Sequence, residues 1–326
     1  MFWIRKASLT LLFCLWINFE HIECVRLNRS STATGSQRQK SFGVCCIFAL
    51  TGCGGVVNRN CTFVRNTGFP GADTNNARTC SVTLNRFVDS SCGGTGDSLS
   101  VISPHSSSRS AFPPAICGTL TGQHMYFESG RMGSTAGQID ILQGSGMAER
   151  RYNIKVSYIP CDSRVRAPSG CTQFFTEDTG TISSYNFAGG QLLGDQIYAN
   201  CIRQNEGFCR VQYSESAIGA PDPFDLDQAQ PTASVTDNCM SLNHVTIPSS
   251  VLEVLMTGAG NSDTVTIVPS MRCNTIFGSD PGSTVPSTLT SLANVPFVVN
   301  LRTLPSDSGR LASRSGFSLD YSQVPC

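Results

Sequence analysis

The chain has 326 residues, a formal net charge of zero and 14% charged residues, against about 25% in an average soluble protein. This length leaves room for two domains of ordinary size. Because neither basic nor acidic residues are in excess, the composition argues against nucleic acid or an acidic membrane surface as a partner.

The N-terminus has the pattern of a signal peptide. Arg5 and Lys6 give a basic start, and the apolar stretch 7–19 follows. This stretch is shorter than the roughly 20 apolar residues that a membrane span needs. The sequence therefore predicts a signal peptide over residues 1–24, with a signal anchor as the alternative, and a secreted, extracellular protein with no stable membrane anchor.

Sixteen cysteines fit an oxidising, extracellular compartment. There is no CxxC pair and no histidine–cysteine cluster at zinc spacing, so the cysteines indicate disulfides rather than a metal site. Cleavage after Cys24 would remove that cysteine and Cys14 and leave fourteen, an even number, whereas cleavage before Cys24 would leave fifteen and one thiol over. The predicted site is after Cys24. The mature chain is then predicted to carry no free thiol.

The rest of the chain is predicted to be built from short strands separated by turns. Residues 25–60 are a polar N-terminal segment that becomes cysteine-rich, and residues 162–170 are a polar linker. Residues 249–256 are compatible with one or two helical turns. Strands are predicted within residues 80–84, 97–102, 124–129, 137–142, 150–159, 180–187, 207–213, 243–247, 263–268, 296–304 and 316–321.

The two halves of the chain end alike. Ile154, Val156 and Tyr158 alternate with polar residues before Pro160-Cys161, and residues 316–326 repeat this pattern before Pro325-Cys326. Alternation is typical of a half-buried strand, and proline ends the ladder because it has no N–H to donate. The repeat predicts an all-β fold of two tandem β-sandwiches, over residues 61–161 and 171–326.

Several stretches resemble the CUB domain, an extracellular jelly-roll-like β-sandwich with two consecutive disulfides. They are CTFVRNTGFPGADTNNARTCSVTL, CGGTGDSLSVI and AICGTLTGQHMYFES in the first half, and CMSLNHVTI, VPFVVNLRTLPSDSGR and GFSLDY in the second. Five further stretches are similar to a family of secreted arthropod proteins with two such domains: FGVCC, GQHMY, RRYNIKVSYIPC, APSGCTQFFTEDTGTISSYNF and NCIRQNEGFC. The resemblance covers about residues 42–326.

The resemblance implies the disulfides Cys61–Cys80, Cys92–Cys117, Cys171–Cys201 and Cys239–Cys273. Sequence alone does not determine how the other cysteines pair. Two further bridges are hypotheses, one between Cys209 and Cys326 and one between Cys161 and a cysteine of the N-terminal segment. The cysteines whose pairing stays open are Cys45, Cys46, Cys53, Cys161, Cys209 and Cys326.

The first half departs from the CUB pattern between Cys80 and Cys92. CUB domains usually place two strands there, and this chain has only eleven residues. Two strands of about five residues and a tight turn need roughly twelve. The first domain is therefore predicted to lack a strand pair, either because the domain is degenerate or because the transcript skips a segment.

No catalytic residue is predicted. Residues 305–310, PSDSGR, faintly resemble the nucleophile loop of trypsin-like proteases, but a serine nucleophile needs a histidine base beside it. None of the four histidines lies in the sequence context of such a base; they are His21, His105, His124 and His244. The sequence therefore predicts a non-enzymatic protein.

Calcium is the one cofactor that the resemblance raises. Some CUB domains bind it through a Glu and two Asp at a loop end, because a hard cation prefers carboxylate oxygens. Asp97, Asn243 and Asp307 are the weak candidates here, and no Glu can be assigned. Plain turn residues are the favoured interpretation, so no cofactor is expected. Asn28 and Asn60 lie in the only glycosylation triplets.

Together these patterns predict a secreted, non-enzymatic module that recognises extracellular proteins or glycans. Two alternatives stay open. The chain could be the non-catalytic CUB region, or an accessory, of an extracellular serine protease, and it could be a structural component of extracellular matrix.

Overall fold

A computed structural model of the protein describes residues 22–25, 45–57, 62–73, 78–83, 97–102, 113–128, 137–143, 151–217, 221–227, 233–235, 239, 241–248, 250–252, 266–268, 270–278, 283–305 and 314–326. The chain forms two compact units. One comprises residues 1–75 and 147–160, and the other comprises 76–146 and 161–326. This division differs from the sequence-based boundaries, because residues 76–146 group with the C-terminal half.

The smaller unit contains a sheet with the strand order β1-β2-β4-β8. Strands β2 and β4 run parallel, and the other neighbours are antiparallel. Strand β1 includes Cys24, after which signal cleavage is predicted, and that cleavage stays a prediction. The bounds of the strands in this unit are β1 (Ile22–Val25), β2 (Cys45–Thr51), β3 (Gly55–Val56), β4 (Thr62–Arg65) and β8 (Asn153–Val156).

A turn after β4 is held by the fully buried Asn66. Its Nδ2 donates to the carbonyl oxygens of Thr67 at 3.0 Å and Gly71 at 2.9 Å. Its Oδ1 accepts from the backbone N–H of Tyr152 at 3.1 Å, next to β8. The Asn66 side chain thus ties the turn after β4 to β8, the strand that was predicted to end the first half.

The larger unit begins with three antiparallel strands in the order β5-β7-β6. They are β5 (Arg78–Thr83), β6 (Ser98–Ile102) and β7 (Gln138–Gln143). The segment between Cys80 and Cys92, where a strand pair was predicted to be missing, is described only as far as residue 83. The strand count of the first half therefore stays a prediction.

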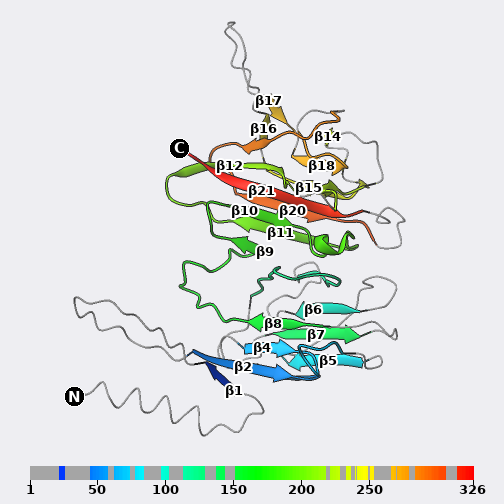
Figure 1. Ribbon diagram of the computed structural model, residues 1–326. Coiled ribbons are helices and arrows are strands. Elements are labelled where there is room, and N and C mark those ends of the chain that lie inside the picture. Colours follow the sequence, from blue (N-terminus) through cyan, green and yellow to red (C-terminus); the bar gives the residue numbers. More distant parts are fainter. Residues whose placement is uncertain are drawn as a thin grey trace, which may run out of the picture. The chain divides into compact units, whose positions relative to one another are not determined.

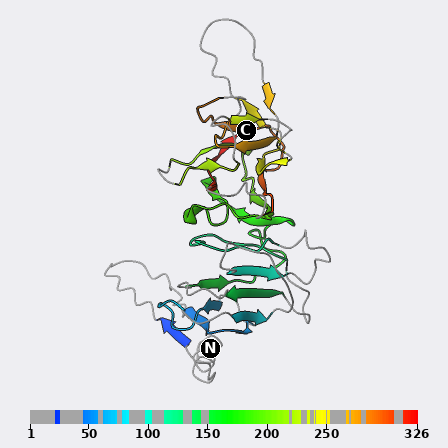
Figure 2. The same cartoon turned by 90° about the vertical axis from the view of Figure 1, so that its right-hand side faces the viewer.

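Residues 171–326 form two sheets (Figure 1 and Figure 2). One has the order β10-β21-β12-β19-β16-β17, with β13 paired to β21, and the other has the order β14-β18-β15-β20-β11-β9. Within these two sheets β9 and β11 pair in parallel, and the other described pairs are antiparallel. The bounds are β9 (Cys171–Phe175), β10 (Thr179–Ser183), β11 (Ile197–Ile202), β12 (Phe208–Glu215), β13 (Phe224–Asp225), β14 (Ala233–Val235), β15 (His244–Thr246), β16 (Ser250–Leu252), β17 (Thr266–Val268), β18 (Met271–Asn274), β19 (Leu289–Ser291), β20 (Val298–Arg302) and β21 (Gly316–Pro325), with a short 3-10 helix η2 (Phe187–Gly189).

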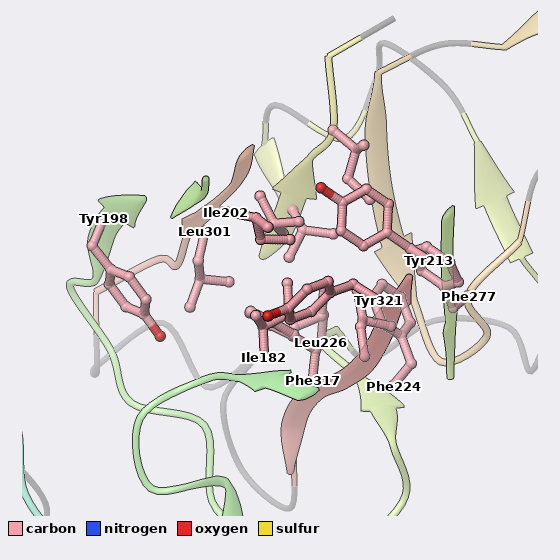
Figure 3. Close-up of a cluster of buried hydrophobic side chains, with 14 of the residues drawn as sticks. Ile182, Tyr198, Ile202, Tyr213, Phe224, Leu226, Phe277, Leu301, Phe317 and Tyr321 are labelled. Carbon is pink, nitrogen blue, oxygen red and sulfur yellow. The ribbon is translucent and has the colours of Figure 1, made fainter. Parts of the chain in front are cut away.

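The core of this domain lies between the two sheets (Figure 3). Phe317, Leu319 and Tyr321 of β21 are at most 3% exposed, so their predicted alternation does mark the buried face of a strand. Val299 and Leu301 of β20 come from the opposite sheet and are buried equally well. Side chains that alternate along strands of both sheets therefore build one apolar layer.

The described part of residues 249–256 is a strand rather than helical turns. Ser250–Leu252 form β16, which pairs with β17 on one side and with β19 on the other. A short apolar run does not distinguish a helix from a buried strand, and here pairing with distant strands decides. In the described residues, no helix is long and apolar enough to cross a membrane.

Residues 113–126 lie against the C-terminal domain and are called the docking segment below. Ile116 is 5% exposed and belongs to the same core cluster as Phe317. The backbone N–H of Tyr126 donates to the oxygen of Thr172 on β9 at 2.7 Å. Residues 124–128 are not a strand, contrary to the prediction, because a histidine side chain takes the place of the next backbone contact.

Candidate functional site

The first candidate site is an end of the C-terminal sandwich where two turns meet the last residues of β21. We call this the turn end; it comprises residues 176–178, 203–207 and 322–326. The side chains of Glu177, Asp178 and Glu206 are exposed there. Loops on a rigid scaffold are where binding proteins usually carry their contact residues.

Hydrogen bonds hold the turn end in one conformation. Asn205 Nδ2 donates to the oxygen of Thr176 at 3.0 Å, and its backbone N–H donates to Gln323 Oε1 at 2.9 Å. Gln323 Nε2 donates to the oxygens of Arg203 at 2.9 Å and Glu177 at 3.2 Å. Asn205 and Gln323 thus tie both turns to β21, so little conformational entropy remains to be lost when a partner binds.

The second candidate site is a polar corner where loops of the same domain meet. Asp227 and Asn243 are fully buried. The backbone N–H of Asn243 donates to Asp227 Oδ2 at 2.9 Å, and Asn243 Oδ1 accepts from the N–H of Leu304 at 2.7 Å. Each bond joins segments far apart in sequence, which is why the sequence did not single out Asp227.

A charge pair closes the polar corner. Arg314 Nη1 lies 2.5 Å from Asp225 Oδ1, and their side chains are 20% and 12% exposed. Burial raises the pKa of the Asp225 carboxyl, and the Arg314 guanidinium opposes that rise. The N–H of Phe224 donates to Asp222 Oδ1 at 3.1 Å beside this pair. The corner already contains a cation, supplied by the chain itself.

The described residues of the corner do not fit a calcium ion. Asn243 Oδ1 is engaged by Leu304, and its buried Nδ2 is a donor without an acceptor in the described structure. A donor cannot ligate a cation, and Asp225 faces a guanidinium instead. Among the described residues, no three His, Cys, Asp or Glu side chains are grouped to hold a metal ion.

The other predicted calcium candidates are not brought to this corner. Asp97 is half-buried and directly precedes β6, in the first half of the larger unit. Asp307 lies outside the described residues, as does most of the PSDSGR stretch. The glycosylation candidates Asn28 and Asn60 also lie outside them, so glycosylation stays a prediction.

The C-terminal domain is pinned by disulfides. The structure contains Cys171–Cys201 and Cys239–Cys273, the two pairs that the resemblance implies for this domain. It also contains Cys209–Cys326, which joins β12 to the last residue of β21 at the turn end. Each such bridge stabilises a domain by roughly 2–4 kcal/mol.

The cysteines of the first half are described less fully. Cys61 and Cys92 lie outside the described residues, so the predicted Cys61–Cys80 and Cys92–Cys117 pairs stay predictions. Cys53 is disulfide-bonded. Cys161 is exposed and forms no disulfide, so the predicted bridge from Cys161 to the N-terminal segment is wrong. The prediction that the mature chain carries no free thiol is contradicted by the same observation, because Cys161 is a free, exposed cysteine.

Both described histidines contact backbone groups of the fold. His244 is 5% exposed, and its Nδ1 lies 2.8 Å from the oxygen of Leu242. His124 Nε2 lies 3.1 Å from both the oxygen and the nitrogen of Phe174 on β9. The rings of Tyr126 and Phe175 contact it edge-on. His124 therefore joins the docking segment to the edge of a sheet.

Acidification is expected to weaken this contact. Burial lowers the pKa of His124, while the hydrogen bond to Phe174 opposes that effect. Because the folded pKa lies below the unfolded value of about 6.5, stability is complete above that pH and is lost as the pH falls towards the folded pKa. The neighbouring Tyr185, whose pKa burial raises, stays neutral throughout.

Urea unfolding of wild type and His124→Gln between pH 7.5 and 5 measures this effect. The wild type is expected to lose more stability than the variant as the pH falls below about 6.5. Equal losses in the two proteins would contradict a role for His124.

The architecture and the site together define an all-β chain whose C-terminal half is a disulfide-bonded sandwich of two sheets. A family model described as the animal CUB domain matches residues 168–324. This part of the chain is therefore a CUB domain, a common extracellular protein-interaction module that is generally non-catalytic. A second CUB domain, over residues 61–161, stays a prediction.

Two of the solved structures that the chain matches contain CUB domains. The CUB1-EGF-CUB2 domains of rat MASP-1 show 14% identity and a TM-score of 0.26, covering 85% of this chain and 99% of that one. The CUB1-EGF-CUB2 domain of human MASP-1/3 shows 14% identity and a TM-score of 0.25, covering 80% of this chain and 98% of that one. No curated protein matches the chain.

Proposed function

We propose that the protein is a secreted, non-enzymatic binding protein that uses the turn end of its CUB domain to recognise an extracellular protein. The observation that carries this proposal is the preorganisation of the turn end. Gln323 and Asn205 fix both turns, and the Cys209–Cys326 bridge anchors the strands beneath them. Rigid loops of this kind bind with a small entropic cost.

The chemistry of the turn end favours a protein with basic groups over a sulfated or otherwise anionic glycan. Its two turns carry the carboxylates of Glu177, Asp178 and Glu206 against the single guanidinium of Arg203. Arg203 already donates from Nη2 to the oxygen of Thr176 and from Nε to Asn205 Oδ1. Exposed carboxylates attract basic partners and repel anionic ones.

A capture experiment tests the proposal. Full-length protein is immobilised and incubated with extracellular fluid, and the retained proteins are identified by mass spectrometry. The double variant Glu177→Gln/Glu206→Gln is expected to retain the partner roughly tenfold less, since charge complementarity steers association. Asp162→Asn, which removes one exposed carboxylate from the linker, is the control and is expected to retain it fully.

The same experiment separates the alternatives. Calcium chelation is expected to leave capture unchanged, because the polar corner is closed by Arg314. Equal capture by wild type and the double variant would contradict the turn end as the binding surface. Capture of a serine protease would support the accessory role, and recovery only in cross-linked, insoluble material would support a matrix role.

A further inference from the structure

The linker before the CUB domain is exposed along nearly its whole length in the described structure. Within residues 161–170, only Ser163 and Ala167 are even half-buried. Val165 is 47% exposed although it is apolar, and it lies between the exposed Arg164 and Arg166. An exposed loop that carries arginine is where proteases with a preference for basic residues cut folded proteins.

In the part of the chain that the structure describes, the linker forms hydrogen bonds only within itself and to the first residue of β9. The N–H of Arg166 donates to the oxygen of Ser163 at 3.1 Å, and its Nη1 donates to the oxygen of Cys161 at 3.2 Å. The N–H of Cys171 donates to the oxygen of Pro168 at 3.2 Å. The backbone around Arg164 and Arg166 can therefore become extended, as a protease requires, without disturbing a sheet.

Arg302 shows why exposure of a side chain alone is not enough. Its side chain is exposed, yet it lies in β20, paired with Ile197 of β11 on one side and with His244 of β15 on the other. A protease would have to remove this strand from the middle of a sheet before it could bind the backbone. The linker arginines have no such protection.

We propose that the linker is a processing site for an extracellular serine protease of trypsin-like specificity, and that the cut protein stays assembled through the docking segment. In the step, water adds across the peptide bond after Arg166 or Arg164. The arginine becomes a new carboxyl terminus, and Ala167 or Val165 receives the proton and becomes a new amino terminus. No oxidant or cofactor is needed.

The two products are not joined by a disulfide. The cysteines that follow the linker are those of the three bridges Cys171–Cys201, Cys209–Cys326 and Cys239–Cys273, and each bridge has both ends after the cut. Reduction is therefore unnecessary to separate the products in a denaturant. Only non-covalent contacts can hold them together in the native state.

The docking segment supplies those contacts. Gln123 Nε2 donates to the oxygen of Ser184 at 2.8 Å, and Gln123 Oε1 accepts from the N–H of Asn186 at 3.3 Å. Asn186 Oδ1 accepts from the N–H of Thr119 at 2.7 Å. Together with the buried Ile116, these groups bind the product that ends in the linker to the CUB domain.

Gln196 extends the contact to the start of the segment. Its Nε2 donates to the oxygens of Ala115 at 3.0 Å and Gly194 at 2.9 Å. Contacts thus run along the docking segment from Ala115 to Tyr126, whose N–H bonds to β9. Processing would leave a two-chain protein. Non-covalent contacts would hold the CUB domain to the rest of the protein, and no peptide bond would link them.

Limited proteolysis of the full-length protein by trypsin tests both parts. New amino termini are labelled and identified over time, and the products are compared by non-reducing denaturing electrophoresis and by native size-exclusion chromatography. A terminus at Ala167 or Val165 is expected early, with two separate bands in denaturant and one peak of undiminished size in the native buffer.

Variants make the test specific. Arg164→Gln/Arg166→Gln is expected to slow formation of the CUB-domain fragment at least tenfold, whereas Arg302→Gln is expected to leave its rate unchanged. Both changes affect exposed side chains, and circular dichroism checks that each variant is folded. A fragment formed equally fast from the double variant, or no terminus in the linker, would overturn the processing site. Two native peaks after the cut would overturn the assembled product.

Discussion

Replacing Gly118 with alanine is expected to destabilise the CUB domain and release the docking segment. Gly118 has φ +85°, and a Cβ atom there would overlap Asn186 Oδ1. Asn186 accepts from Thr119 and donates to the oxygen of Gln191 at 3.0 Å, so its displacement breaks bonds on both sides of the contact. We expect a loss of about 3–4 kcal/mol in the free energy of unfolding, from left-handed strain of about 1–2 kcal/mol and lost hydrogen bonds of about 1 kcal/mol each.

Gly122 is the matched control for this prediction. It lies in the same docking segment with φ +81°, but nothing lies within 4 Å of where its Cβ atom would be. Gly122→Ala should therefore show only the backbone strain, about 1–2 kcal/mol. Urea unfolding of both variants measures the difference. Equal losses would mean that the contact with Asn186 contributes nothing.

Replacing Phe317 with alanine is expected to have an effect of similar or greater size. The ring is fully buried between the two sheets and packs among side chains from both (Figure 3). Removing a buried aromatic ring typically costs about 3–5 kcal/mol, because the cavity does not close. For a domain of this size, that loss corresponds to a fall in melting temperature of roughly 10 °C.

Val285→Ala is the control, because this apolar side chain is 66% exposed. A surface change of this kind usually alters stability by no more than about 0.5 kcal/mol. Both variants are measured by thermal unfolding followed by circular dichroism. A shift for Phe317→Ala that is no larger than that of Val285→Ala would contradict the position of the core between the sheets.

Local features of this chain could be predicted from its sequence, whereas features that depend on distant residues could not. The alternation of Phe317, Leu319 and Tyr321 predicted a strand with a buried face, since side chains of a strand point alternately to its two sides. The same reasoning left residues 249–256 undecided. There the pairing of β16 with β17 and β19 determines the conformation, and neither partner can be recognised from the run itself.

The sites show the same division. The exposed, polar linker with Arg164 and Arg166 is visible in the sequence, because composition and local turns decide exposure there. The pairing of Asp225 with Arg314 is not, because 89 residues separate them and only the folded loops bring them together. Asn243 was a calcium candidate in the sequence. Distant loops place the Asp227 carboxylate against its backbone N–H and the Leu304 N–H against its Oδ1, and these contacts argue against that role.

The sequence by itself determined the strand-rich composition, the alternating core positions and, through its resemblance, a CUB domain in the C-terminal half. These properties follow from the order of neighbouring residues and from short motifs. Only the tertiary structure decided that residues 113–126 pack on the CUB domain. The partners of Gln123 there are backbone groups of Ser184 and Asn186. Every residue carries such groups, so no sequence pattern marks which of them a distant side chain will meet.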